Sequence, residues 1–182
     1  MKTVNFKGLF TAALFALAIH SATAQTTPQA ASDNPGNYDQ GFRLGFGLSG
    51  GYVFEDPFGA AVGADARLQY DLSKRNSITL TTGYTHLFLD GDRDDLGFIP
   101  VKAGFKGFIF GDSFYVQGEV GAAIPVTADY NETSLILAPS IGYATEHIDF
   151  SVRYEYYDKF RDVNNNKGVG QLALRIAYGF RL

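Results

Sequence analysis

Residues 171–182 read QLALRIAYGFRL, and an apolar side chain stands at every second position. These apolar positions are Leu172, Leu174, Ile176, Tyr178, Phe180 and Leu182. Because successive side chains of a β-strand point to opposite faces, a period of two predicts a strand with one apolar face. Residues 41–55 repeat the pattern, with small or polar residues between the apolar ones.

The same period recurs along the chain and predicts eight strands of about 12 to 15 residues each. A tilted strand needs roughly 9 to 11 residues to cross a bilayer, so each segment is long enough to span one. No helical period of comparable length competes with them after residue 40. The predicted strands are residues 41–55, 59–72, 77–90, 96–109, 113–127, 134–145, 148–160 and 168–182.

Short and long connections alternate between the predicted strands. The short set comprises residues 73–76, 111–112 and 146–147. The longer, very polar set comprises residues 90–95, 128–133 and 161–167, and it is joined by the brief connection at residues 56–57. Short periplasmic turns and longer outer loops are typical of transmembrane barrels. The sequence therefore predicts an all-β fold, an eight-stranded antiparallel up-and-down transmembrane β-barrel with both ends on the periplasmic side.

A soluble lipid-carrying barrel would show the same alternation with its apolar face turned inward. In that case Leu172, Leu174 and Ile176 would line a cavity. Two observations favour the membrane barrel. First, the positions between the apolar ones, which form the polar face of each strand, hold small residues and a few charged ones, and such residues suit a narrow lumen. Second, the apolar face of each strand has no Lys or Arg near the strand centre, where a basic side chain facing lipid would destabilise the barrel by about 2–4 kcal/mol.

Aromatic residues gather towards both ends of the predicted strands, as the two membrane interfaces favour. Towards the long connections lie Tyr52, Phe54, Tyr84, Phe88, Phe98, Tyr154 and Tyr156. Towards the short connections lie Phe42, Tyr70, Phe114, Phe150, Tyr178 and Phe180. We expect these residues to form two belts on the lipid-facing exterior.

Residues 1–24 have the features of an export signal. A basic start precedes the apolar residues 8–19, which are too few for a transmembrane helix, and residues 22–24 (Ala-Thr-Ala) suit a signal peptidase. Residues 25–40 are polar and aperiodic, which predicts a flexible periplasmic leader. The barrel domain is then residues 41–182.

The charge balance excludes nucleic acid as a partner. The chain has 15 basic and 19 acidic residues, a net charge of −4. Loss of Lys2 and Lys7 with the signal leaves 13 against 19, about −6, whereas nucleic-acid binding needs a basic footprint. The chain has no cysteine, so an exported fold would not depend on disulfides.

The last predicted strand also resembles the C-terminal assembly signal of outer-membrane barrels. The matching residues are Leu174, Ile176, Tyr178, Phe180 and Leu182, although the commoner last residue is Phe. The whole periodic part resembles the small eight-stranded family typified by OmpX and the membrane domain of OmpA. This resemblance implies a monomeric integral protein in the outer membrane of a Gram-negative-type envelope. It also implies two partners, the barrel-assembly machinery during biogenesis and outer-membrane lipid with lipopolysaccharide.

Some small outer-membrane barrels are enzymes that hydrolyse or transfer lipid acyl chains, which makes the histidines of this chain candidate catalytic residues. One deacylase family carries a His-x-Ser pair on a strand, and neither His86 nor His147 is followed by Ser in that pattern. We therefore expect no catalytic residues and no enzyme activity. A structure with His86 within hydrogen-bond reach of a hydroxyl and a carboxylate would favour the alternative of a lipid-modifying enzyme.

The acidic residues 90–95 resemble the start of a calcium-binding loop. Asp at alternate positions opens an EF-hand loop, but here Asp95 stands at the glycine position and Val101 at the position of the bidentate Glu. We therefore expect a solvated loop, no metal site and no cofactor; the alternative is weak binding of a divalent cation that bridges to lipopolysaccharide phosphates.

Ten charged residues are predicted to face the lumen and to form an interior polar network. They are Arg43, Asp65, Arg67, Lys102, Lys106, Glu119, Asp149, Arg153, Glu155 and Arg175. Charges in a narrow lumen must be paired or hydrated, so they form either an ion-pair lattice that plugs the barrel or a narrow pore for small solutes. Since about eight strands leave an interior that side chains just fill, we favour the plug. The sequence thus indicates a non-enzymatic outer-membrane barrel with a structural or surface-interaction role.

Overall fold

The computed structural model describes residues 41–55, 58–89, 95–110, 113–127, 132–160 and 168–182. The predicted signal and leader, residues 1–40, lie outside the described residues. The described part forms eight strands. They are β1 (Phe42–Val53), β2 (Phe58–Asp71), β3 (Asn76–Leu89), β4 (Leu96–Phe110), β5 (Phe114–Pro125), β6 (Ser134–Ala144), β7 (Ile148–Tyr157) and β8 (Val169–Arg181).

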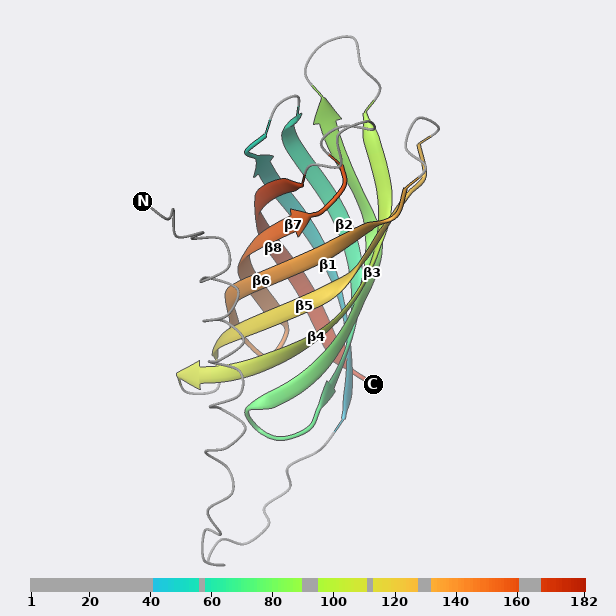
Figure 1. The fold of residues 1–182 in the computed structure, drawn as a ribbon. Helices are drawn as coiled ribbons and strands as arrows, with labels where there is room; N and C mark the ends of the chain where they lie inside the picture. The colour runs from blue at the N-terminus through green and yellow to red at the C-terminus, as the bar shows by residue number, and fades with distance from the viewer. Residues whose placement is uncertain (1–40, 56–57, 90–94, 111–112, 128–131, 161–167) are drawn as a thin grey trace, which may run out of the picture. The chain divides into compact units, whose positions relative to one another are not determined.

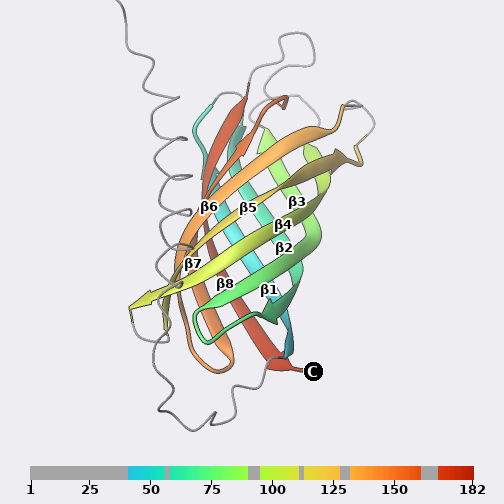
Figure 2. The ribbon, with the colours of Figure 1, turned by 60° about the horizontal axis from the view of Figure 1, so that its bottom comes forward.

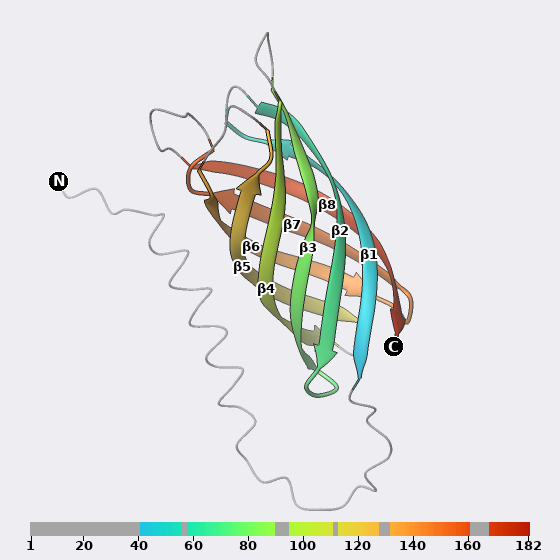
Figure 3. The ribbon, with the colours of Figure 1, turned by 90° about the vertical axis from the view of Figure 1, so that its right-hand side faces the viewer.

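The eight strands close into one antiparallel barrel in chain order, with β8 paired to β1 (Figure 1). Leu48 on β1 lies opposite Ile176 on β8, and Gly50 lies opposite Leu174, so the closing pair is a full ladder. The strands run steeply tilted around the barrel in each view (Figures 2 and 3). Closure leaves no unpaired sheet edge, which a bilayer would not tolerate. The predicted fold is confirmed.

Both ends of the barrel sequence meet at the rim that carries the short turns. The backbone amide of Leu182 donates to the carbonyl oxygen of Phe42 at 3.0 Å. At the same rim the amide of Gly179 donates to the carbonyl of His147 at 2.8 Å, between β8 and the turn before β7. We refer to this rim as the short-turn end and to the opposite rim as the long-loop end.

Side chains alternate between lumen and exterior along each strand, as the period of two requires. On β8, for example, Ala173 and Arg175 are buried, whereas Leu174 is two-thirds exposed. One irregularity departs from the sequence prediction. A register shift between Phe58 and Ala60 extends β2 to Phe58 and turns this side chain into the barrel, where it is 3% exposed.

The interior is apolar at the long-loop end, which the sequence pattern did not predict. A cluster of buried side chains fills the lumen there. Its larger members are Val53, Phe58, Leu87, Leu96, Phe98, Ile136, Tyr157, Phe160 and Val169. Phe98 packs edge-on against Tyr157 with ring centroids 5.2 Å apart. The assignment of Phe98 to the exterior belt was therefore wrong, because the inward parity of β4 falls on even residue numbers and includes Phe98.

The other predicted belt residues lie on the exterior. Tyr52, Phe54 and Phe88 are exposed at the long-loop end, and Phe114 and Tyr178 at the short-turn end. Exposed leucine, isoleucine and valine side chains cover the band between them. The described residues contain no helix long and apolar enough to cross a bilayer.

Candidate functional site

All ten charged residues predicted to face the lumen stand on the inward parity of their strands. They are contributed by β1 (Arg43), β2 (Asp65, Arg67), β4 (Lys102, Lys106), β5 (Glu119), β7 (Asp149, Arg153, Glu155) and β8 (Arg175). The structure brings nine of them together in two groups around Glu119 and Asp149, whereas Arg43 lies apart from both groups. Within each group, some side chains come from neighbouring strands and others meet across the lumen.

Glu119 is the centre of the first group. Its carboxylate lies 3.4 Å from Nη2 of Arg67, and 3.9 Å from both Nζ of Lys102 and Nη1 of Arg153. The hydroxyl of Thr81 donates to Oε1 of Glu119 at 2.6 Å. Three cations therefore surround one carboxylate that is almost completely buried.

Glu155 supplies the second carboxylate of this group, on the side of the apolar cluster. Its Oε1 accepts from Nζ of Lys102 at 2.6 Å and lies 3.0 Å from Nε of Arg153. Its Oε2 accepts from the hydroxyl of Tyr157 at 2.7 Å and from the side-chain amide of Gln171. Tyr157 thus joins the polar network to the apolar cluster, since its ring packs against Phe98.

Asp149 is the centre of the second group, nearer the short-turn end. Its carboxylate accepts from Nζ of Lys106 at 2.7 Å and from the hydroxyl of Tyr115 at 2.6 Å. Arg175 reaches it at 3.7 Å and also forms a two-nitrogen contact with Asp65. Lys106 therefore pairs with Asp149 on β7 and does not contact Glu119, whose basic neighbours belong to the first group.

Arg43 pairs with a residue that the sequence analysis missed. Its Nε donates to Oδ2 of Asp71 at 3.0 Å, and Asp71 also accepts from Gln69 and Ser77. The uncharged members Thr81, Tyr157 and Gln171 were missed as well. Inward parity on the same strands would have identified all of them, because it selects uncharged polar residues as well as charged ones.

Below the network, the lumen opens into a polar pocket of about 510 Å³ at the short-turn end. Gly45, Ala177 and Gly179 leave room there, and Arg43, Lys106 and Arg175 line the pocket together with Asp71 and Asp149. The lumen thus has three layers, an open polar pocket, an ion-pair network and an apolar cluster.

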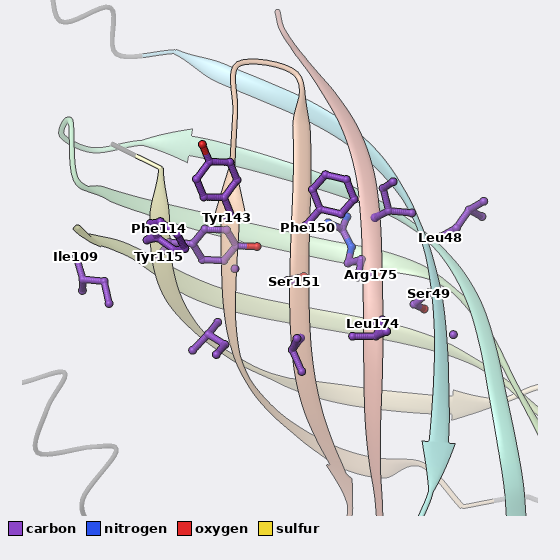
Figure 4. Close-up of a pocket in the computed structure, with 15 residues that line it drawn as sticks. Leu48, Ser49, Ile109, Phe114, Tyr115, Tyr143, Phe150, Ser151, Leu174 and Arg175 are labelled. Carbon is purple, nitrogen blue, oxygen red and sulfur yellow. The ribbon is translucent and has the colours of Figure 1, made fainter. Parts of the chain in front are cut away.

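The exterior carries a shallow apolar groove of about 670 Å³ across β4 to β8 and β1 (Figure 4). Leu48, Phe150 and Leu174 line it from outside, whereas Tyr115 and Arg175 belong to the lumen side of the same wall. The proposed assembly-signal residues Leu174, Ile176, Tyr178, Phe180 and Leu182 are all exposed on this exterior. An exposed apolar surface of this kind is suited to contact with lipid hydrocarbon chains.

A polar contact chain interrupts the apolar exterior at the long-loop end of β3. Nδ1 of His86 lies 3.3 Å from the hydroxyl of Tyr84, and its Nε2 lies 3.0 Å from Oδ2 of Asp95. Oδ1 of Asp95 accepts from the backbone amide of Leu89 at 2.9 Å, which fixes the carboxylate. His86 therefore has both a hydroxyl and a carboxylate within hydrogen-bond reach. The hydroxyl is that of Tyr84 on the same outward face, since the neighbouring Thr85 faces the lumen.

No protein-family profile matches the chain, and no curated protein matches its sequence. Solved structures do match it. The crystal structure of Ail, the attachment invasion locus protein of Yersinia pestis, aligns with a TM-score of 0.52 and 18% identity over 78% of this chain and 99% of Ail. Ail in a phospholipid bilayer nanodisc, described as an outer membrane protein, gives a TM-score of 0.52 and 17% identity over 78% of this chain and 100% of that one.

The chain has the fold of a small outer-membrane β-barrel. A de novo designed transmembrane β-barrel gives a TM-score of 0.50 and 16% identity over 82% of this chain and 100% of the design. The alignments with the designed barrel and with Ail both cover almost the whole length of the solved structure. The apolar exterior of the present barrel suits the lipid surroundings in which such barrels are embedded.

Proposed function

We propose that this chain is a non-enzymatic integral outer-membrane protein with a plugged lumen and a structural or surface-interaction role. The observation that carries the proposal is the filling of the lumen by two successive layers. Arg67, Lys102 and Arg153 close around Glu119, and the apolar cluster lies across the lumen beyond Glu155.

The pairing of the charges supports a plug over a narrow pore. Separating a buried ion pair leaves an uncompensated charge, which costs about 3–5 kcal/mol. A conducting path would have to open the group around Glu119 and would also have to hydrate the apolar cluster around Phe98. The second requirement disfavours ion passage independently of the first, since apolar constrictions block conduction by dewetting.

Planar-bilayer recording on the refolded barrel tests the proposal. We expect no steady open channel at neutral pH, with heat-modifiable gel mobility as the check that the inserted protein is folded. Protein unfolded by boiling before addition is the matched control for detergent leaks. Large, stable single-channel steps from the folded protein alone would overturn the plug and favour a porin.

The alternative of a lipid-modifying enzyme is favoured by one observation, the chain Tyr84–His86–Asp95 on the exterior. A histidine between a carboxylate and a hydroxyl is the arrangement that activates a nucleophile. Here the hydroxyl is a phenol, whose oxygen shares its negative charge with the aromatic ring once deprotonated and is then a weaker nucleophile than a serine alkoxide. Incubation with an ester-linked phospholipid and measurement of released fatty acid tests this alternative. Release that His86→Ala abolishes, in a barrel of unchanged heat modifiability, would replace the non-enzymatic proposal.

A further inference from the structure

His86 is exceptional on the exterior of the barrel. Within the eight described strands it is the only His, Asp, Glu, Lys or Arg on the outward parity. Polar ionisable side chains are unfavourable next to lipid and mark functional sites when they occur there. His86 is about one-quarter exposed, and its two contacts, Tyr84 and Asp95, are 44% and 38% exposed. The group is therefore accessible from the membrane interface.

On the β2 side, small side chains begin next to Tyr84. The register places the exposed Val62 opposite His86, Ala64 opposite Tyr84 and Ala66 opposite Thr82. The alanine strip of Ala64 and Ala66 runs from Val62 along β2 towards the barrel centre, whereas bulkier aliphatic and aromatic side chains cover most of the remaining exterior. An extended hydrocarbon chain can lie flat against such a strip, with its polar end beside His86.

On the β4 side of the group, a glycine leaves space for the ring of Tyr84. A side chain at Gly97 would overlap the Tyr84 ring, so the glycine allows this ring to lie across β4. Phe88 packs edge-on against His86 with ring centroids 4.7 Å apart. Tyr84, His86 and Phe88 therefore form a short aromatic wall above the alanine strip.

The chemistry of the group selects among headgroups. Asp95 provides a carboxylate acceptor, Tyr84 a hydroxyl that both donates and accepts, and the aromatic rings provide flat apolar faces. A phosphate would meet the Asp95 carboxylate at close range, and like charges repel. A sugar offers hydroxyl donors to the carboxylate and C–H faces to the rings.

We propose that Tyr84, His86 and Asp95 with the alanine strip of β2 form a binding site for a glycolipid. The sugar headgroup lies against the polar chain, and one hydrocarbon chain runs along Ala64 and Ala66. The inference rests on the proposed membrane location, because it needs a lipid at this surface. The proposed site lies on the exterior of the barrel and is separate from the plugged lumen.

The test uses the folded barrel in a neutral polyoxyethylene detergent, which contributes no sugar. The probe is a diacyl glucosylglycerol, and the comparator is phosphatidylglycerol with the same chains. Native mass spectrometry and a binding titration measure retention. We expect one glucosyl lipid per barrel and weaker retention of phosphatidylglycerol. Equal or tighter retention of phosphatidylglycerol would overturn the proposal.

Matched variants locate the binding. Asp95→Asn is expected to weaken glucosyl-lipid binding about tenfold, the effect of losing one charge-assisted hydrogen bond, and Tyr84→Phe severalfold, because it removes a hydrogen bond between neutral groups. Tyr154→Phe removes the same hydroxyl from another exposed tyrosine, on β7, and is expected to leave binding unchanged. Equal affinity in all three variants would overturn the site.

Two further measurements separate the possible causes of failure. Ala64→Leu fills the strip and is expected to weaken the lipid severalfold while leaving heat modifiability unchanged. If soluble methyl glucoside binds as tightly as the glucosyl lipid, the hydrocarbon chain contributes nothing and the glycolipid proposal is wrong. Loss of the heat-modifiable form in the wild type would instead contradict the proposed membrane barrel itself.

Discussion

The guanidinium of Arg67 on β2 and the carboxylate of Glu119 on β5 meet across the lumen, 3.4 Å apart. These two strands are not neighbours in the sheet, so the contact ties opposite walls of the barrel together. Arg67 also donates to Thr81 on β3 and to Gln117 on β5. A cross-lumen tie of this kind stabilises closure in a way that strand pairing alone does not.

Replacing the central carboxylate is therefore expected to weaken the barrel strongly. Glu119→Ala leaves Arg67, Lys102 and Arg153 without this partner, and removal of one member of a buried pair costs about 3–5 kcal/mol. The free energy of unfolding in urea, measured in lipid vesicles, checks this value. Glu132→Ala is the control, because Glu132 forms an exposed pair with Lys159 at 3.5 Å, and such pairs contribute about 0–1 kcal/mol. Equal losses in the two variants would contradict a central role for Glu119.

Gly121 on β5 is predicted to be indispensable for the spacing of β4 and β5. A Cβ at this position would overlap the carbonyl oxygen of Val101 and the Cα of Lys102, which are backbone atoms of the paired strand. Because backbone cannot rotate away, Gly121→Ala is expected to destabilise the barrel by about 1–3 kcal/mol, the usual effect of overpacking.

Gly118 on the same strand is the control for Gly121. A Cβ there has no heavy atom within 4 Å, so Gly118→Ala is expected to be close to neutral. Urea unfolding of both variants under the same conditions makes the comparison. A larger loss for Gly118→Ala than for Gly121→Ala would contradict the predicted close approach of the strands.

The sequence predicted the strands and the ten inward charges because both depend on the period of two. It did not predict the apolar cluster. At the long-loop end, inward positions such as Leu87 and Phe98 are apolar and so are many outward ones, so the alternation that separates the two faces is lost there. The pairing of Lys106 with Asp149 was also out of reach. Lys106 lies on the strand adjacent to that of Glu119, but its partner is set by side-chain reach across the closed lumen. Alternation identifies a face but does not identify a contact across it.

The contact between His86 and Asp95 was missed for a different reason. Asp95 lies just before β4, in a polar connection whose residues follow no period. Its position is set by the backbone amide of Leu89 at the end of β3, a hydrogen bond that sequence alone does not reveal. The charge of a connecting residue is therefore evident from sequence, whereas its strand partner is not.

The Leu89–Asp95 contact is predicted to depend on pH in the acidic range. The hydrogen bond from the Leu89 amide, together with that to His86, holds the pKa of Asp95 below its ordinary value of 3.8. A lowered pKa in the folded state means that the contact is complete at neutral pH and is lost as the pH falls through the lowered pKa. The amide shift of Leu89, followed by NMR during acid titration, should have its midpoint below 3.8. Asp95→Asn removes the titrating group, and its Leu89 shift should not move in this range; a wild-type midpoint above 3.8 would contradict the assignment.

The exposed face of β8 is predicted to decide whether the barrel assembles. Leu174 is 66% exposed on the lipid side and belongs to the proposed assembly signal, whereas its neighbour Ala173 is 2% exposed and faces the lumen. Leu174→Arg places a charge against lipid, at a cost of about 2–4 kcal/mol near the midplane, and also interrupts the alternation of the last strand. We expect Leu174→Arg and Ile176→Arg to be depleted from the outer-membrane fraction, and Ala173→Ser to accumulate normally, since a hydroxyl suits the polar interior beside Arg153. Quantitative blotting of membrane fractions, with heat-modifiable mobility as the folding check, gives the result. Accumulation of Leu174→Arg at the wild-type level would mean that this face of β8 does not meet lipid.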